Sequence, residues 1–165
     1  CADITPMGPA SMWLLKLAPG EQIRFLGPLG RFVVDQESTR EKVFLATGTG
    51  IAPFRSMITD ALEGGWKENM RLIWGQRYEE DIFWNEDFTH LAAQHVNFSY
   101  TMTLSRPTEI WKGEKGRVTA HLFGEDNFLQ KEYYLCGSRG MVDGVKMALL
   151  EKNIPENQIK TELFY

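Results

Sequence analysis

The residues with the clearest chemical meaning are Thr47-Gly48-Thr49-Gly50, a glycine-rich stretch between an apolar run and a helix-like pattern. The apolar run, residues 43–46, has the continuous hydrophobicity of a parallel strand that is covered on both faces. Beyond Pro53, apolar residues recur at i, i+3, i+4, i+7 and i+8, which marks one face of a helix. The sequence therefore predicts a strand, a tight turn and a helix from Pro53, where a missing N–H group costs little.

A turn of this kind suits an anionic ligand. Glycine lets a backbone approach a ligand closely, and the N–H groups and positive dipole end of a helix attract negative charge. A pyrophosphate fits that description. Gly48-x-Gly50 followed by Pro53 lacks the third glycine of the common G-x-G-x-x-G pattern, so a tight turn without any ligand stays open as the alternative.

Small, polar and cationic residues also follow the other predicted strands. Ligands of open parallel sheets bind outside the carboxyl ends of the strands, so these residues are expected at one edge of the sheet. Such an edge suits a ligand with two phosphates and two riboses. Taken singly, an arginine here is more often a solvated surface charge, and a cysteine a small buried apolar residue. The residues concerned are Gly75-Gln76-Arg77, Ser105-Arg106 and Cys136-Gly137-Ser138-Arg139.

Strand-like and helix-like stretches alternate after a polar linker at residues 35–42, which predicts right-handed βαβ units. The expected fold class is α/β, a doubly wound, Rossmann-like, five-stranded parallel sheet with helices on both faces. Two short strand-like runs, residues 22–26 and 31–34, precede the linker, and we place a domain boundary between residues 36 and 37. The expected strands are residues 43–46, 71–74, 98–104, 133–136 and 159–164, and the expected helices start at Pro53 and near Glu86, Val118 and Met141.

Composition excludes several other classes. The 165 residues carry a net charge of -4 without a basic run, which argues against a nucleic-acid surface. No apolar stretch approaches the length of a membrane span. Cys1 and Cys136 are the only cysteines, so there is no disulfide framework and no iron–sulfur set, and a reducing, cytoplasmic setting is expected. The sequence begins at Cys1 within strand-like residues, and we expect a fragment of a longer protein.

Other reactive or aromatic residues have simpler explanations. His90, His95 and His121 lack metal-ligand spacing, so we expect surface or helix-face positions and no metal site. Ser11 and Ser138 have no Ser/His/Asp context, which leaves nucleophilic catalysis unsupported. The aromatic residues around the second strand are expected to pack in the core rather than to stack on bases. These are Trp74, Tyr78, Phe83, Trp84 and Phe88.

In their order along the chain, these motifs resemble the ferredoxin–NADP reductase superfamily, flavin-dependent enzymes that pass electrons between a nicotinamide nucleotide and a one-electron carrier. The resemblance covers nearly the whole chain, and Pro53 in place of the third glycine is the form of the phosphate loop that this family uses. The matching stretches are GPLGRF at residues 27–32, ATGTGIAPFRSM at 46–57, WGQRYEEDIFWNEDF at 74–88, Ser105-Arg106, GRVT at 116–119, YLCG at 134–137 and ELFY at 162–165.

The resemblance implies an NAD(P)-binding domain over residues 37–165. Its first loop would hold the pyrophosphate with backbone N–H groups and the Thr49 side chain, the next two loops would lie near the adenosine half, and the fourth near the nicotinamide. A preference for NADH or NADPH stays open, because members of either preference carry a pair such as Ser105-Arg106. The implied NAD(P) contacts are Thr47, Gly48, Thr49, Gly50, Ile51, Ala52, Pro53, Arg77, Ser105, Arg106, Cys136, Gly137, Ser138 and Met141.

By the same resemblance, Cys136, Glu162 and Thr49 are the expected catalytic residues. Cys136 would lie close to the hydride-carrying carbon of the nicotinamide, and Glu162 would complete the flavin side of the site. A ring near the end of the chain would cover the flavin face, and the register leaves both Phe164 and Tyr165 open. On residue type alone, Glu162 is equally an exposed strand residue.

Residues 1–36 resemble the rear end of the family's antiparallel flavin-binding barrel, a few strands and one short helix. GPASMWL at residues 8–14 is similar to the family's G-x-x-S-x-x-L segment, which implies FAD contacts at Gly8 and Ser11. The barrel's main flavin motif, R-x-Y-S/T, begins at no arginine of this sequence. The resemblance therefore implies a missing N-terminal flavin-binding segment, with weak nucleotide binding and little turnover for this chain alone.

The implied activity is that of an NAD(P)H-dependent flavoprotein reductase. A hydride passes from the nicotinamide C4 to the N5 atom of FAD, and single electrons then pass to a ferredoxin, a flavodoxin or an oxygenase partner. The alternative is a non-redox nucleotide-binding or regulatory module that uses the same fold without flavin. Glu162, the closing aromatic residues and residues 8–14 favour the reductase, because a pure sensor needs none of them.

Overall fold

The computed structural model describes all residues except 1–3, 5–6, 28, 124–126 and 164–165, and it divides the chain into two units, Cys1–Arg31 and Phe32–Tyr165. The division falls five residues before the expected boundary between 36 and 37 because Phe32 and Val34 pack against the core of the second unit. The Phe32 ring lies 5.8 Å from Phe54 and 6.2 Å from Tyr134, measured between centroids. That the first unit is the end of a flavin-binding barrel stays a prediction.

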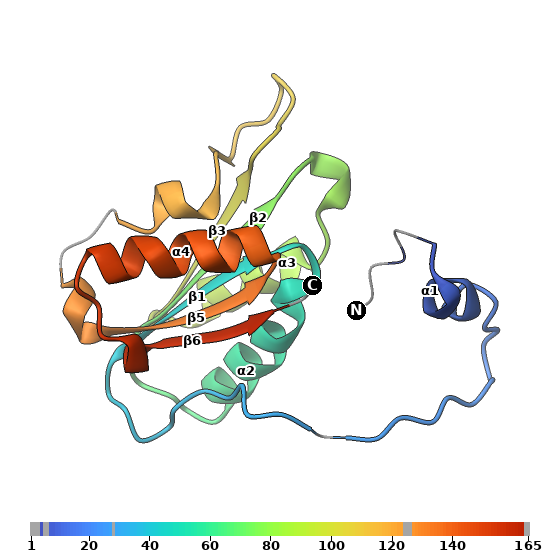
Figure 1. Ribbon diagram of the computed structural model, residues 1–165, viewed down its shortest axis with the longest axis horizontal. Coiled ribbons are helices and arrows are strands. Elements are labelled where there is room, and N and C mark those ends of the chain that lie inside the picture. The colour runs from blue at the N-terminus through green and yellow to red at the C-terminus, as the bar shows by residue number, and fades with distance from the viewer. Residues whose placement is uncertain (1–3, 5–6, 28, 124–126, 164–165) are drawn as a thin grey trace. The chain divides into compact units, whose positions relative to one another are not determined.

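Within the described residues, the second unit contains a six-stranded parallel sheet of order β4-β3-β2-β1-β5-β6 (Figure 1). The expected α/β, doubly wound parallel fold is confirmed. The sheet has one strand more than the five expected, because two residues at its edge pair with β3. The strands are β1 (Glu41–Thr47), β2 (Met70–Gln76), β3 (Phe98–Leu104), β4 (Glu114–Lys115), β5 (Lys131–Gly137) and β6 (Ile159–Leu163).

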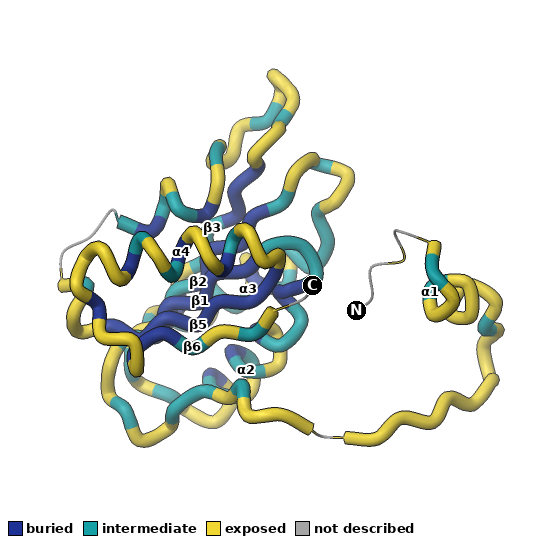
Figure 2. Tube along the Cα trace, viewed as in Figure 1, coloured by how far each residue is buried: buried dark blue, intermediate teal, exposed yellow. Residues whose placement is uncertain are grey.

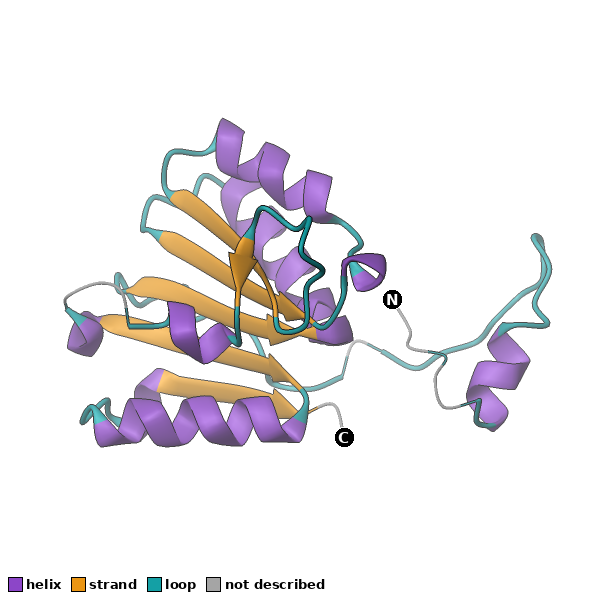
Figure 3. Ribbon diagram, turned by 90° about the horizontal axis from the view of Figure 1, so that it is seen from above, coloured by secondary structure: helices purple, strands orange, loops and turns teal. Residues whose placement is uncertain are grey.

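Helices cover both faces of the sheet (Figure 3). α2 (Ile51–Glu63) and α3 (Asn85–Gln94) bury apolar side chains on one face, and α4 (Arg139–Glu151) buries its own on the other. The helix expected near Val118 is a single 3-10 turn. The 3-10 turns are η1 (Gly48–Gly50), η2 (Glu79–Asp81), η3 (Val118–His121), η4 (Phe128–Gln130) and η5 (Glu156–Gln158).

The central strands are buried on both faces, as Figure 2 shows along β1 and β5. In β1, Phe44 and Ala46 belong to the core under α2, whereas Val43 and Leu45 belong to the core under α4. This two-sided burial explains the continuous apolar run, because neither face of the strand contacts water.

The two strands expected before the linker are not present. Residues 22–26 and 31–34, as far as the structure describes them, form no strand. Phe25 and Leu26 are 90% and 85% exposed. A strand exists only through hydrogen bonds to a neighbouring strand, and the described part of the chain pairs no strand with these residues. The expected short helix is present as α1 (Pro9–Leu14), with Pro9 in its first turn.

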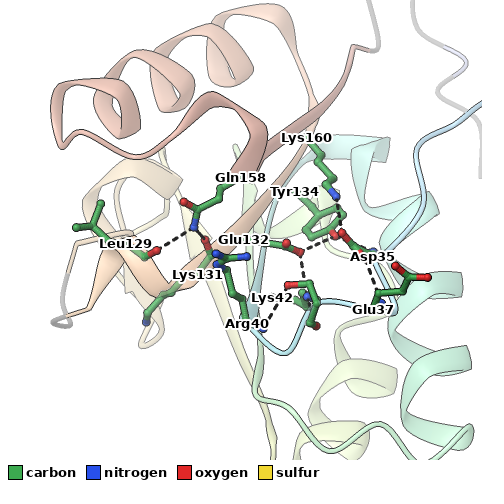
Figure 4. Close-up of polar contacts among 11 residues, drawn as sticks. Asp35, Glu37, Arg40, Lys42, Leu129, Lys131, Glu132, Tyr134, Gln158 and Lys160 are labelled. Atoms are coloured by element: carbon green, nitrogen blue, oxygen red, sulfur yellow. Dashed lines mark hydrogen bonds and ion pairs between the residues drawn. The ribbon is translucent and has the colours of Figure 1, made fainter.

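A cluster of polar side chains fixes the start of β1 and β5 to the linker (Figure 4). The Lys42 ammonium, fully buried, lies 2.9 Å from a Glu132 carboxylate oxygen and donates to the Ser38 carbonyl. Tyr134 donates its hydroxyl hydrogen to Glu132 and accepts a bond from the Asp35 backbone N–H. Burial raises the pKa of Glu132, but hydrogen bonds from Lys42 and Ser38 and the charges of Lys42 and Lys160 outweigh it, and the net pKa lies below 4.5.

This ion pair predicts a large effect for the Lys42→Met variant. An unpaired carboxylate would stay buried at Glu132, so the free energy of unfolding at pH 7 should fall by about 3–5 kcal/mol. The lowered pKa of Glu132 means that the parent chain loses this contribution as the pH falls below 4.5 and through the folded-state value. In the variant, protonation of Glu132 relieves the unpaired charge, so acid should reverse part of the loss.

Urea denaturation between pH 4 and pH 7 measures both effects. The double variant Lys42→Met/Glu132→Leu is the control, since it removes both charges and should regain most of the stability lost in the single variant. A double variant that is no more stable than Lys42→Met would show that the charges are not coupled.

Candidate functional site

The candidate site lies where the strand order changes direction. The chain builds outward from β1 through β2 and β3, and then returns to place β5 on the other side of β1. The loops after β1 and β5 therefore leave the sheet on opposite sides, which opens a crevice between them at the carboxyl edge. Both loops carry residues expected at the site, residues 47–53 and 136–141.

These two loops touch through their backbones. A Cβ atom at Gly50 would collide with the carbonyl oxygen of Cys136 and would lie 2.7 Å from the Gly137 Cα atom. A Cβ atom at Gly137, where φ is +146°, would collide with the Thr47 hydroxyl oxygen, and the Ser138 backbone N–H donates to that same oxygen over 3.2 Å. Gly50 and Gly137 are therefore required for the contact between the two loops, whether or not a ligand binds there.

Of the two glycines in the turn after β1, Gly48 is the one that faces open space. It adopts a left-handed φ of +55°, and a Cβ atom there would have no heavy atom within 4 Å. No side chain caps the N-terminus of α2, a thirteen-residue helix that begins at Ile51, two residues before the expected Pro53. The Ile51 N–H bonds back to the Thr49 carbonyl, but a helix offers no internal partners to the other N–H groups of its first turn, so this end retains donors and positive dipole charge for an anion. The glycine turn therefore fits the phosphate-binding role expected of it.

The structure also brings together the residues expected near the adenosine half. Arg77 and Arg106 are exposed at the ends of β2 and β3, and the Arg106 backbone N–H donates to the Arg77 carbonyl over 2.9 Å. Ser105 is likewise exposed, and its N–H bonds to the Gln76 carbonyl. The Arg106 guanidinium lies 3.2 Å from the Tyr78 hydroxyl, so Tyr78 belongs to this cluster and not to the core.

Sequence reasoning missed the contact that ties these two loops together. Glu79 accepts hydrogen bonds from the Thr108 backbone N–H over 2.9 Å and from its hydroxyl over 2.6 Å. The hydroxyl bond lowers the pKa of Glu79 below its ordinary value. The contact bridges residues 29 apart in the chain, so no local pattern indicated it.

Cys136 is fully buried and lies beside Glu162 in the register of β5 and β6. Burial, with a smaller effect from the Glu162 charge, raises the pKa of the thiol to about 12. The thiol is therefore protonated at neutral pH and is neither a base nor a nucleophile. Glu162 itself is half-buried, and Met141 lies in the first turn of α4. Contact of these residues with a nicotinamide stays a prediction.

The expected FAD residues fall into two groups. Gly8 is the N-cap residue of α1, where no side chain caps the helix, and Ser11 lies within that helix. Phe164 and Tyr165 lie outside the described residues. Among the residues that the structure does describe, no set of histidine, cysteine or acidic side chains could hold a metal ion. His121 lies half-buried on η3, and its Nε2 atom lies 3.0 Å from the Thr103 hydroxyl oxygen.

The aromatic residues around β2 pack largely as expected. Trp74 and Phe88 are fully buried, and Phe83 and Trp84 pack at the edge of the same core. Trp74 has one further contact that the sequence did not indicate, because its indole N–H donates to the Gly48 carbonyl over 3.0 Å. No helix in the described part of the chain is long and apolar enough to cross a bilayer.

Comparison with known proteins agrees with this geometry. Residues 44–147 match the family model of the oxidoreductase NAD-binding domain. Ferredoxin–NADP reductase B of Sorangium cellulosum is 33% identical over 165 residues, which cover 95% of this chain and 68% of that protein. The reductase component of phenol 2-monooxygenase from a Pseudomonas species is 34% identical, over 91% of this chain and 44% of that protein.

A solved structure has the same fold. The ferredoxin NADP+ reductase of Neisseria gonorrhoeae, with bound FAD and NADP, superposes with a TM-score of 0.73 over 96% of this chain and 70% of that one, at 22% identity. The chain therefore belongs to the ferredoxin–NADP reductase family through its NAD-binding domain. It spans about two thirds of the length of the first relative and less than half of the second.

The contact between loops predicts that Gly50→Ala destabilises the fold. The added methyl group meets backbone atoms that cannot rotate away, so the free energy of unfolding should fall by about 1–3 kcal/mol. Gly144→Ala is the matched control, since its methyl group enters open space on α4 and should stabilise the helix by up to about 1 kcal/mol. Urea denaturation compares the two, and equal midpoints would contradict the contact.

Burial of Cys136 predicts slow alkylation. A pKa of about 12 in place of 9.0 lowers the thiolate population at pH 8 about a thousandfold. In a Cys1→Ser background, iodoacetamide should therefore modify the folded chain at least about a hundredfold more slowly than the chain in urea. Cys136→Ala in the same background measures non-specific reaction. Equal rates in the folded and unfolded chains would place the thiol at the surface.

Proposed function

We propose that this chain is the NAD(P)-binding part of a flavin-dependent reductase. The observation that carries the proposal is the turn from β1 to α2, where Gly48 faces open space and the N-terminus of α2 is uncapped. In the proposal, the pyrophosphate of NAD(P)H lies on this turn, bound by the backbone N–H groups of residues 47–53 and by the Thr49 hydroxyl. The family relationship supports this assignment.

The two halves of the nucleotide extend in opposite directions from that turn. On one side, Arg77, Ser105 and Arg106 form a cationic, hydroxyl-bearing cluster that suits the adenosine ribose or a 2′-phosphate on it. Whether the bound form is NADH or NADPH stays open. On the other side, Gly137 leaves its backbone without a side chain beside Cys136, so that a flat ring can approach the carboxyl edge of β5.

The chemistry of the proposed reaction belongs to FAD, which accepts a hydride and releases electrons singly when it is bound. Residues of this chain bind and orient the nucleotide and exclude water from its reactive ring. Cys136 would do so as a neutral, buried group, and Glu162 would provide a carboxylate next to it. In the proposal the flavin is held by a segment outside this sequence, as expected from the lack of an R-x-Y-S/T motif.

The proposed electron acceptor is a ferredoxin, a flavodoxin or an oxygenase component. The names of the relatives support this, because one is a ferredoxin–NADP reductase and another is the reductase component of a monooxygenase. A cytoplasmic setting, expected from the cysteine content, is part of the proposal. A nucleotide-binding module without redox activity is less favoured, since the relatives are reductases by name.

Two substitutions at Gly48 test the phosphate site. Asparagine and aspartate have nearly the same size and both tolerate the left-handed backbone, but only aspartate adds negative charge. Gly48→Asp should bind ADP at least about tenfold more weakly than Gly48→Asn, because the carboxylate would lie beside the pyrophosphate. Isothermal titration in low salt measures the difference, which should shrink at high ionic strength.

Adenosine provides the control ligand because it lacks phosphate groups. The two variants should bind it equally and should unfold at similar urea concentrations. If both variants bind ADP, NADH and NADPH as tightly as the parent chain does, the pyrophosphate does not lie on this turn and the proposed site is wrong.

A further inference from the structure

Trp74 connects the core to the turn that carries the proposed phosphate site. Its side chain is fully buried, and its backbone pairs with Ala46 at the end of β1. From there the indole N–H reaches the Gly48 carbonyl, with 3.0 Å between nitrogen and oxygen. A hydrogen bond to the backbone of a loop restrains that loop at the bonded peptide.

The restrained peptide is the one that joins Gly48 to Thr49. A peptide unit is planar and trans, so its carbonyl oxygen and its N–H hydrogen point in opposite directions. Because the Gly48 oxygen points at the buried Trp74 indole, the Thr49 N–H points away from it. Gly48 itself adopts a left-handed backbone, with φ of +55°.

The indole cannot easily follow a movement of the loop. Phe83 packs against its edge with 4.8 Å between ring centroids at an interplanar angle of 76°, and Phe88 does so at 6.2 Å and 67°. Phe83 lies in the segment after β2, and Phe88 lies in α3. If the Gly48 peptide rotated, the indole N–H would be left without its acceptor inside the core, which is unfavourable.

We propose that Trp74 is a positioning residue for phosphate binding: its indole N–H holds the Gly48 peptide in the orientation that directs the Thr49 N–H at the ligand. This inference rests on the proposed function, since it explains how the turn is prepared for an anion. It also assigns a role beyond core packing to the aromatic segment of residues 74–88. Phe83 and Phe88 pack against the indole and restrain it, and the indole in turn restrains the loop through its hydrogen bond to Gly48.

The test removes the donor without changing the shape. Benzothienylalanine, in which sulfur replaces the indole N–H, is introduced at position 74 in place of tryptophan. ADP affinity should fall about threefold to tenfold, the effect of one lost hydrogen bond, whereas adenosine affinity should not change. Trp74→Phe, which also removes the N–H, should show the same selective loss for ADP.

Trp66 offers a matched control. Its buried Nε1 atom has no hydrogen-bond partner among the residues that the structure describes, so benzothienylalanine at position 66 removes a donor but no bond. That variant should bind ADP as the parent chain does. Unchanged ADP affinity at position 74, or an equal loss for adenosine, would overturn the positioning role.

A measurement without ligand separates this inference from the proposed function. In nitrogen-15 NMR spectra, the amide signals of Thr49 and Gly50 should shift in the position-74 variant and stay in place in the position-66 variant. If the parent chain binds no ADP, the proposed function fails, yet shifted loop amides would still support the hydrogen bond. If those amides do not shift, the inference fails whatever the ligand affinities are.

Discussion

The site depends on the close contact between two backbone turns at the point where the strand order reverses. Gly50 lies against the carbonyl of Cys136, and Gly137 lies against Thr47, with no room for a Cβ atom at either glycine. This contact brings the start of α2 next to the end of β5, and hence the phosphate end of the proposed nucleotide site next to its nicotinamide end. A side chain at either glycine would separate the two loops.

The sequence predicted the sheet well because parallel strands that are buried on both faces leave a strong local signal. β1 and β5 contain unbroken apolar runs at residues 43–46 and 133–136, and the polar residues after them mark where each strand ends. β4 was missed because two residues carry no periodicity. Residues 22–26 and 31–34 were expected to form strands because these runs are strand-like in composition, but pairing is a non-local property that composition does not determine.

The sequence predicted which residues lie together at the carboxyl edge of the sheet. It did not predict which of them form hydrogen bonds. Strand ends meet at one edge by topology alone, so the order of strands and helices along the chain was enough to place Arg77 and Arg106 together. The Glu79–Thr108 bridge and the Trp74–Gly48 bond link residues more than twenty positions apart. Such bonds depend on side-chain direction in the folded chain, and only the structure reveals them.

The amino and carboxyl edges of the sheet differ in how far their polar groups are hydrogen-bonded within the protein. At the amino edge, Lys42, Glu132 and Tyr134 form hydrogen bonds with one another and with the linker. At the carboxyl edge, the N-terminus of α2 has no side-chain cap, and Gly48 leaves space beside it. Groups that are already paired gain little from a ligand, whereas unpaired N–H groups gain a full charge-assisted bond. In the proposed function, this difference in hydrogen bonding helps to direct an anion to the carboxyl edge.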